Sequence, residues 1–126
     1  MVNKLYNISE PDGKLFPIEL KEQPFNVKRI FYVTNVPKGE ERGQHAHYQT
    51  QQQLICIQGN IDVKLHDGKE LKTYNIKDGE SIFIDKMIYD SQVFNTGKDI
   101  LLVLCSTNYD KGDYIEDFDE FIELAK

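Results

Sequence analysis

The sequence contains few of the residues from which many binding sites are built. Its 126 residues include no tryptophan, two cysteines and three histidines, and only two of the fifteen basic residues, Arg29 and Arg42, are arginines. Acidic residues outnumber basic ones, which gives a formal net charge of −6. Nucleic acids and anionic membrane surfaces bind dense clusters of lysine and arginine, so the sequence predicts neither as a partner.

Long apolar runs are also absent. No segment approaches the roughly 20 apolar residues of a membrane span, and the N-terminal residues MVNKLYNISEPDG lack the apolar core of a signal peptide. We therefore expect a cytoplasmic protein without a membrane partner. A chain of this length is sufficient for one hydrophobic core and short for two, so we expect a single domain over residues 1–126.

The two cysteines lie in apolar segments that resemble strands. Cys56 belongs to Leu54-Ile55-Cys56-Ile57, and Cys105 ends the run that begins at Leu101. We expect both to be buried, reduced thiols, with a disulfide between them as the alternative. Neither cysteine follows a helix start or an activating base in the sequence, so neither is predicted to be a nucleophile.

Short apolar and β-branched stretches, separated by turn residues, predict a protein made mostly of strands. The expected strands cover about residues 15–20, 29–36, 44–48, 53–58, 61–66, 71–76, 81–85, 91–95 and 100–107. Asp67-Gly68 and Asp78-Gly79 are typical hairpin turns, and the regular spacing predicts a sandwich or barrel. Only the C-terminal residues have helical spacing, with Asp117 as the N-cap of one short helix.

Two of the three histidines and one of the two arginines lie within one segment, Arg42-Gly43-Gln44-His45-Ala46-His47. Because side chains alternate along a strand, His45 and His47 would point to one face and into one cavity. The alternative is a pair of polar residues that face solvent or are satisfied in the core. The third histidine, His66, precedes a tight turn, and we expect it to be solvated. If Arg29 and Arg42 converge, they offer forked donors suited to phosphate; surface ion pairs with carboxylates are the alternative.

This pattern resembles the first motif of the cupin family in Gly43, His45, His47 and Gly59. The resemblance implies an all-β fold, a small double-stranded β-helix (the cupin or jelly-roll barrel), followed here by one short C-terminal helix. Glutamines occupy the place of the metal-binding glutamate of cupins, and residues 78–95 contain no histidine to supply the third imidazole. Two imidazoles and an amide hold a divalent metal poorly, so we expect no metal.

More of the chain resembles the sugar-nucleotide 3,4-ketoisomerases, a metal-free, WxcM-like group of cupins. The resemblance covers Arg-Gly-x-His-Ala-His with a glutamine five residues on, and continues in residues 13–19, 24–33, 101–106 and 109–119, nearly the whole chain. It implies an isomerase that moves the carbonyl of a thymidine-diphosphate-linked 4-keto-6-deoxyhexose from C4 to C3 through an enediolate. It also implies that no cofactor is needed and that the enzyme is a homodimer, in which some members exchange their N-terminal strands. The resemblance further implies a role in deoxyaminosugar biosynthesis, such as that of lipopolysaccharide O-antigen.

The same resemblance suggests a role for each candidate residue. His45 and His47 would carry the proton transfers, although the sequence does not tell which one removes the C3 proton. Arg29 and Arg42 would hold the diphosphate or the sugar oxygens, and Gln52 would bind a sugar hydroxyl or orient an imidazole.

Tyr32 is a further substrate-binding candidate, although strand alternation places it on the opposite face from Arg29.

The chain departs from the family pattern in Met87-Ile88-Tyr89-Asp90-Ser91-Gln92, where Tyr89 replaces a tryptophan and Asp90 replaces a basic residue or histidine. This strand would line the barrel mouth, so the C4 configuration of the product and the nucleotide base stay open. Two alternatives also stay open, a cupin-type 3,5-epimerase of the same substrate and a non-catalytic cupin that binds a sugar nucleotide.

Overall fold

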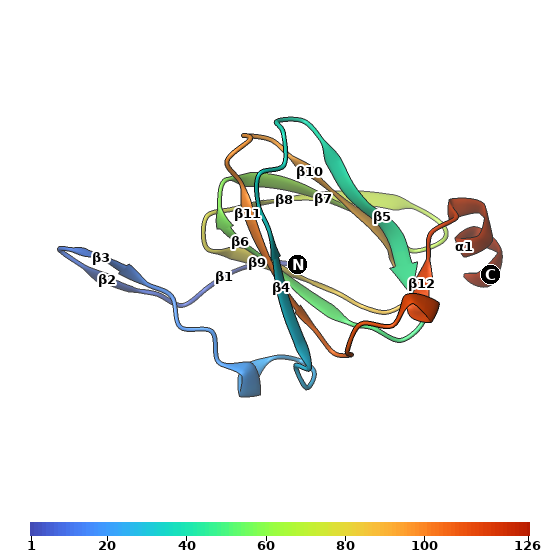
Figure 1. The fold of residues 1–126 in the computed structure, drawn as a ribbon, viewed down its shortest axis with the longest axis horizontal. Coiled ribbons are helices and arrows are strands. Elements are labelled where there is room, and N and C mark those ends of the chain that lie inside the picture. The colour runs from blue at the N-terminus through green and yellow to red at the C-terminus, as the bar shows by residue number, and fades with distance from the viewer.

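The computed structural model describes residues 1–126 and contains two antiparallel five-stranded sheets (Figure 1). One sheet has the order β1-β9-β6-β11-β4, the other the order β12-β5-β10-β7-β8, and β2 and β3 form a separate hairpin. The strands are β1 (Val2–Lys4), β2 (Ile8–Glu10), β3 (Gly13–Leu15), β4 (Arg29–Val33), β5 (Glu41–His47), β6 (Gln52–Gln58), β7 (Asn60–His66), β8 (Leu71–Lys77), β9 (Glu80–Ile84), β10 (Tyr89–Phe94), β11 (Ile100–Cys105) and β12 (Tyr114–Ile115). The helices are two short 3-10 turns, Leu20–Glu22 and Lys111–Asp113, and α1 (Phe118–Leu124).

The core lies between the two sheets and is built by strand alternation. Every second residue of a strand points inward, so Ile61 and Val63 of β7 are fully buried together with Leu54 and Cys56 of β6. Phe94 of β10 and Phe121 of α1 are the largest fully buried side chains. The expected all-β jelly roll is therefore confirmed.

Most of the predicted strands are confirmed, with ends that differ by a few residues. The strand expected over about 15–20 is wrong, because Leu15 ends β3 and Leu20 begins a 3-10 turn. Pro17 lies between them and has no N–H to give to a strand ladder. The sequence pattern did not predict β1, β2, β3 and β12, which are two or three residues long and too short to show a period. β1 is nevertheless part of the first sheet, where it is the edge strand and pairs with β9.

The C-terminal helix and its cap are confirmed. The Asp117 side chain accepts a hydrogen bond from the Glu120 backbone N–H at 3.0 Å. Fully buried Phe121 fixes α1 against the barrel by packing with Ala46 and Ile115. His66 differs from expectation: its ring lies edge-on to Phe118 with centroids 5.1 Å apart, because α1 covers this end of β7. It is half-buried under the helix and not solvated.

The two cysteines are free and buried, as the sequence predicted. Burial raises the pKa of the Cys56 thiol to about 12, so this sulfur stays protonated and unreactive. None of the helices is both long enough and apolar enough to pass through a membrane.

Candidate active site

An irregularity in β5 shapes the candidate site. β5 pairs with β10, and the register shifts so that Asp90 lies opposite His45 while Ser91 lies opposite Gly43. Gln44 is left without a partner and has a φ of 61°, as expected of a β-bulge. A Cβ on Gly43 would lie 3.2 Å from the Asp90 carbonyl oxygen, and the φ of Gly43 is 90°, so glycine suits this position.

The bulge changes which side chains of β5 face the barrel interior. Strict alternation would place Arg42 and His45 on opposite faces, yet both line one cavity of about 90 Å³ between the sheets. The other polar residues at this cavity are Gln52, Asp90 and Gln92. The apolar part of its wall consists of Phe31, Val33, Leu54, Leu101 and Val103. The cavity thus presents a few polar groups against an apolar wall, which is the usual composition of a small-molecule site.

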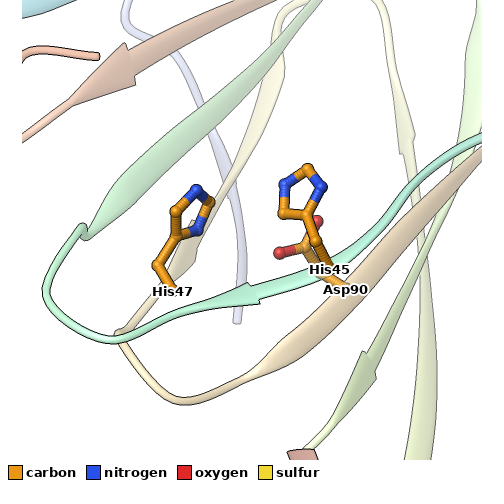
Figure 2. A group of neighbouring side chains, drawn as sticks. All are labelled: His45, His47 and Asp90. Atoms are coloured by element: carbon orange, nitrogen blue, oxygen red, sulfur yellow. The ribbon is translucent and has the colours of Figure 1, made fainter. Parts of the chain in front are cut away.

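The two histidines project from the same side of β5, as their spacing predicted (Figure 2). Their ring centroids are 4.9 Å apart, and the rings meet edge to face. The Tyr114 ring of β12 packs against both, with centroids 5.0 Å from His45 and 4.6 Å from His47. Tyr114 was not predicted as a site residue, because only the pairing of β12 with β5 brings it there.

Burial keeps both imidazoles neutral. It lowers the pKa of His45, and it lowers the pKa of His47 to about 4, helped by the positive charges that His45 and Arg29 can carry. His47 Nε2 is buried without a hydrogen-bond partner. At neutral pH the pair therefore offers uncharged ring nitrogens that can accept a proton.

Asp90 is the main site residue that sequence reasoning did not assign. It was recognised only as a departure from the family pattern, but the structure places its carboxyl beside His45 (Figure 2). Donor atoms of His45, His47 and Asp90 all lie within 4.8 Å of one another. Two imidazoles and a carboxylate are a set that first-row metals accept, whereas the expectation of no metal considered two imidazoles and an amide.

Gln52 and Arg29 lie on either side of Cys105 in the first sheet. Gln52 Nε2 and Arg29 Nη2 each donate to the Cys105 sulfur at 3.5 Å, and β11 pairs with both of their strands. The Arg29 guanidinium lies over Phe31 and Tyr109, 5.4 and 5.7 Å from the ring centroids. Its Nε is buried without a partner, so this side chain is held in place by packing and keeps one donor free.

The two arginines do not share a strand or a sheet. Arg42 is an exposed residue at the cavity on β5, whereas Arg29 lies on β4 and is not among the cavity-lining residues. Tyr32, the other candidate on β4, is 70% exposed and also lies outside the cavity wall. Alternation is the reason, since Phe31 and Val33 on either side of Tyr32 face inward.

The chain is similar to known proteins over its whole length. The family model described as "FdtA: WxcM-like, C-terminal" matches residues 1–126. A curated TDP-4-oxo-6-deoxy-alpha-D-glucose-3,4-oxoisomerase from Aneurinibacillus thermoaerophilus is 31% identical over 126 residues, covering 96% of this chain and 91% of its own. The agreement thus extends over the whole barrel.

Solved structures give the same result. QdtA, a sugar 3,4-ketoisomerase from Thermoanaerobacterium thermosaccharolyticum in complex with TDP, superposes with a TM-score of 0.93 at 35% identity, over 99% of this chain and 93% of that one. A mutant of QdtA was solved in complex with TDP-4-keto-6-deoxyglucose and gives the same TM-score at 34% identity, over 99% and 92% of the two chains. A 3'-monoepimerase from Streptomyces bikiniensis is only 14% identical, covers 90% of this chain and 66% of its own, and with a TM-score of 0.79 shares the fold alone.

Proposed function

Because this chain belongs to the WxcM-like, C-terminal family typified by FdtA, we propose that it is a 3,4-ketoisomerase of a TDP-linked 4-keto-6-deoxyhexose. The observation that carries this proposal is a pair of neutral imidazoles in mutual contact, the half-buried ring of His45 at the cavity and the buried ring of His47 beside it. The alternative of a 3,5-epimerase is disfavoured, since the epimerase is a distant relative and the ketoisomerases match nearly the whole chain.

The chemistry required is proton transfer at two neighbouring carbons. The C4 ketone makes the C3 proton acidic, so a neutral imidazole can remove it and leave an enediolate. Reprotonation at C4 completes the shift, and the electrons stay within the sugar. An imidazole with a lowered pKa is neutral at pH 7, and once protonated it returns its proton readily, which suits His45 and His47 to reprotonation at C4. Which of the two serves C3 is left to experiment.

Three polar side chains are proposed to bind the substrate. Arg42 lines the cavity and would bind sugar or phosphate oxygens there, because its forked donors fit such an anion. Gln52 keeps its amide oxygen available for a sugar hydroxyl while its Nε2 donates to Cys105. Arg29 would contribute the unpartnered Nε of its half-buried side chain, whose guanidinium lies against Tyr109. We give Tyr32 no role within this cavity.

We also propose that the protein is a homodimer. The β2–β3 hairpin projects from the barrel (Figure 1), and all six of its strand residues are exposed. Edge strand β4 exposes Ile30 by 50% and Tyr32 by 70%, which is an apolar edge that a second copy would cover. Sedimentation equilibrium tests this, and a monomer at micromolar concentration would contradict it.

The function is tested by proton NMR with the purified protein and TDP-4-keto-6-deoxyglucose in deuterated buffer, with and without a chelator. We expect a 3-keto sugar that carries deuterium at C4, formed equally well with chelator. His45→Asn and His47→Asn should each lower the rate by about 100-fold or more. Deuterium at both C3 and C5 with the ketone still at C4 would indicate an epimerase, and saturable binding without conversion would indicate a binding module.

A further inference from the structure

The least satisfied polar group in the cavity is the carboxyl of Asp90. The residue is 1% exposed, although it lies on β10 directly opposite His45. Its Oδ1 accepts a hydrogen bond from Gln92 Nε2 at 2.7 Å, whereas its Oδ2 is buried and has no partner. Buried polar atoms in proteins are almost always hydrogen-bonded, so an unpartnered oxygen at a cavity indicates a place for a group that arrives with a ligand.

No cation compensates this carboxyl. None of the ion pairs in the structure involves Asp90, and the two nearby imidazoles are neutral. A buried carboxyl without a positive partner keeps its proton, and burial accordingly raises the pKa of Asp90 to about 7. Asp90 is thus available near neutral pH both as an acid and, after losing its proton, as a base.

The proposed reaction needs a group of this kind. Isomerisation moves a carbon-bound proton from C3 to C4, and it also moves a hydroxyl proton from O3 to O4. The two imidazoles account for the carbon-bound proton. We propose that Asp90 is a third proton-transfer residue, which carries the hydroxyl proton from O3 to O4. This inference rests on the proposed function and goes beyond the pair of histidines.

The transfers balance in two steps. First, an imidazole removes the C3 proton, the C3–H electron pair forms the C3=C4 bond, and the C4 carbonyl oxygen takes the proton of Asp90 Oδ2. Second, the O3–H electron pair forms the C3 carbonyl, Asp90 Oδ2 takes the O3 proton, and the double-bond electrons take a proton at C4 from an imidazolium. Asp90 ends protonated as it began, and the sugar is neither oxidised nor reduced overall.

A single oxygen is sufficient for this role, because O3 and O4 are on adjacent carbons. Gln92 holds Oδ1, and Asp90 lines the cavity, so Oδ2 is the carboxyl oxygen left for the substrate. The next residue on β10, Ser91, alternates to the other face of the strand, where its hydroxyl donates to Glu41 Oε2 at 2.5 Å. Ser91 therefore provides a matched control for a buried polar substitution on the same strand.

The test compares wild type, Asp90→Asn and Ser91→Ala in deuterated buffer with TDP-4-keto-6-deoxyglucose. Proton NMR follows two rates, the formation of 3-keto product and the exchange of the C3 proton in unreacted substrate. In Asp90→Asn we expect product formation to fall by about 100-fold or more, while C3 exchange falls by less than about 10-fold. An amide can donate a hydrogen bond to the enediolate but does not transfer a proton, so the two rates separate. Ser91→Ala should keep both rates within about threefold of wild type.

Several results would overturn the inference. Product formation by Asp90→Asn within about threefold of wild type would do so, and a parallel fall of both rates would indicate a structural role only. A stoichiometric metal whose removal stops the wild-type reaction would mean that these groups hold an ion instead. If wild type leaves the substrate unchanged, the proposed function itself fails. Should Asp90→Asn not fold, infrared difference spectra of the wild type decide, because adding substrate must shift the band of a protonated carboxyl.

Discussion

Replacing His47 by asparagine should make the protein less sensitive to mild acid. His47 is 3% exposed, and burial lowers its pKa to about 4, compared with 6.5 in an unfolded chain. Between these two values the unfolded state binds a proton that the folded state does not, so stability falls as the pH falls from 6.5 toward 4. Asparagine does not titrate, so the variant lacks this contribution.

The size of the effect follows from the two pKa values. At pH 7 the linkage costs the folded state only about 0.2 kcal/mol, whereas at pH 5 it costs about 2 kcal/mol. We therefore expect the free energy of unfolding of wild type to drop between pH 7 and pH 5 by about 2 kcal/mol more than that of His47→Asn. Urea denaturation of both proteins at both pH values measures this double difference, in which contributions common to both proteins cancel.

His66→Asn is the matched control, because it removes a histidine that lies under α1 and outside the cavity. An equal drop for wild type and His47→Asn would refute the reasoning. It would mean that His47 titrates in the folded protein much as it does in the unfolded chain. The imidazole would then not be held neutral by burial, and its suitability as a base would need another explanation.

Three further outcomes test the packing and the site. Gly59→Ala should lower the unfolding free energy by about 2 kcal/mol or more, because a Cβ would lie 2.1 Å from Asp99 Oδ1 at a φ of 111°. Gly39→Ala, at a φ of 88° with nothing within 4 Å, should cost only about 1 kcal/mol, and equal thermal shifts would contradict this. Phe121→Ala should cost about 3–5 kcal/mol in urea denaturation, since this ring is fully buried; a smaller loss would mean that α1 contributes little. Arg42→Lys should raise KM about tenfold with kcat nearly unchanged in the NMR assay, as a lysine lacks the forked donors; a change in kcat alone would argue against a binding role.

The strand pattern and the pair of histidines could be predicted from local order in the chain. Alternation of apolar residues marked the core strands, because a strand that is buried on one face repeats every two residues. The same rule placed His45 and His47 on one face of β5 and Tyr32 opposite Arg29, and the structure agrees with both placements. The N-cap of α1 could also be predicted from the sequence, since Asp117 accepts a hydrogen bond from a backbone N–H only three residues away.

Other parts of the site were decided by pairing between distant strands. The bulge at Gly43 and Gln44 depends on the register of β5 with β10, and it alone brings Arg42 to the same cavity as His45. Tyr114 reaches the imidazoles only because β12 pairs with β5. Neither feature produces a periodic pattern in the local sequence, since both depend on residues more than forty positions apart in the chain.

Asp90 shows most clearly the difference between what the sequence determines and what the tertiary structure decides. The sequence marked it as an unusual residue, but its chemistry comes from what surrounds it: full burial, one oxygen held by Gln92, one oxygen free and two imidazoles nearby. An aspartate in water is a simple anion, whereas the same carboxyl between two sheets retains its proton near neutral pH. The residue types and their order thus determined the barrel and the histidine pair, while tertiary burial decided the protonation states of His45, His47 and Asp90.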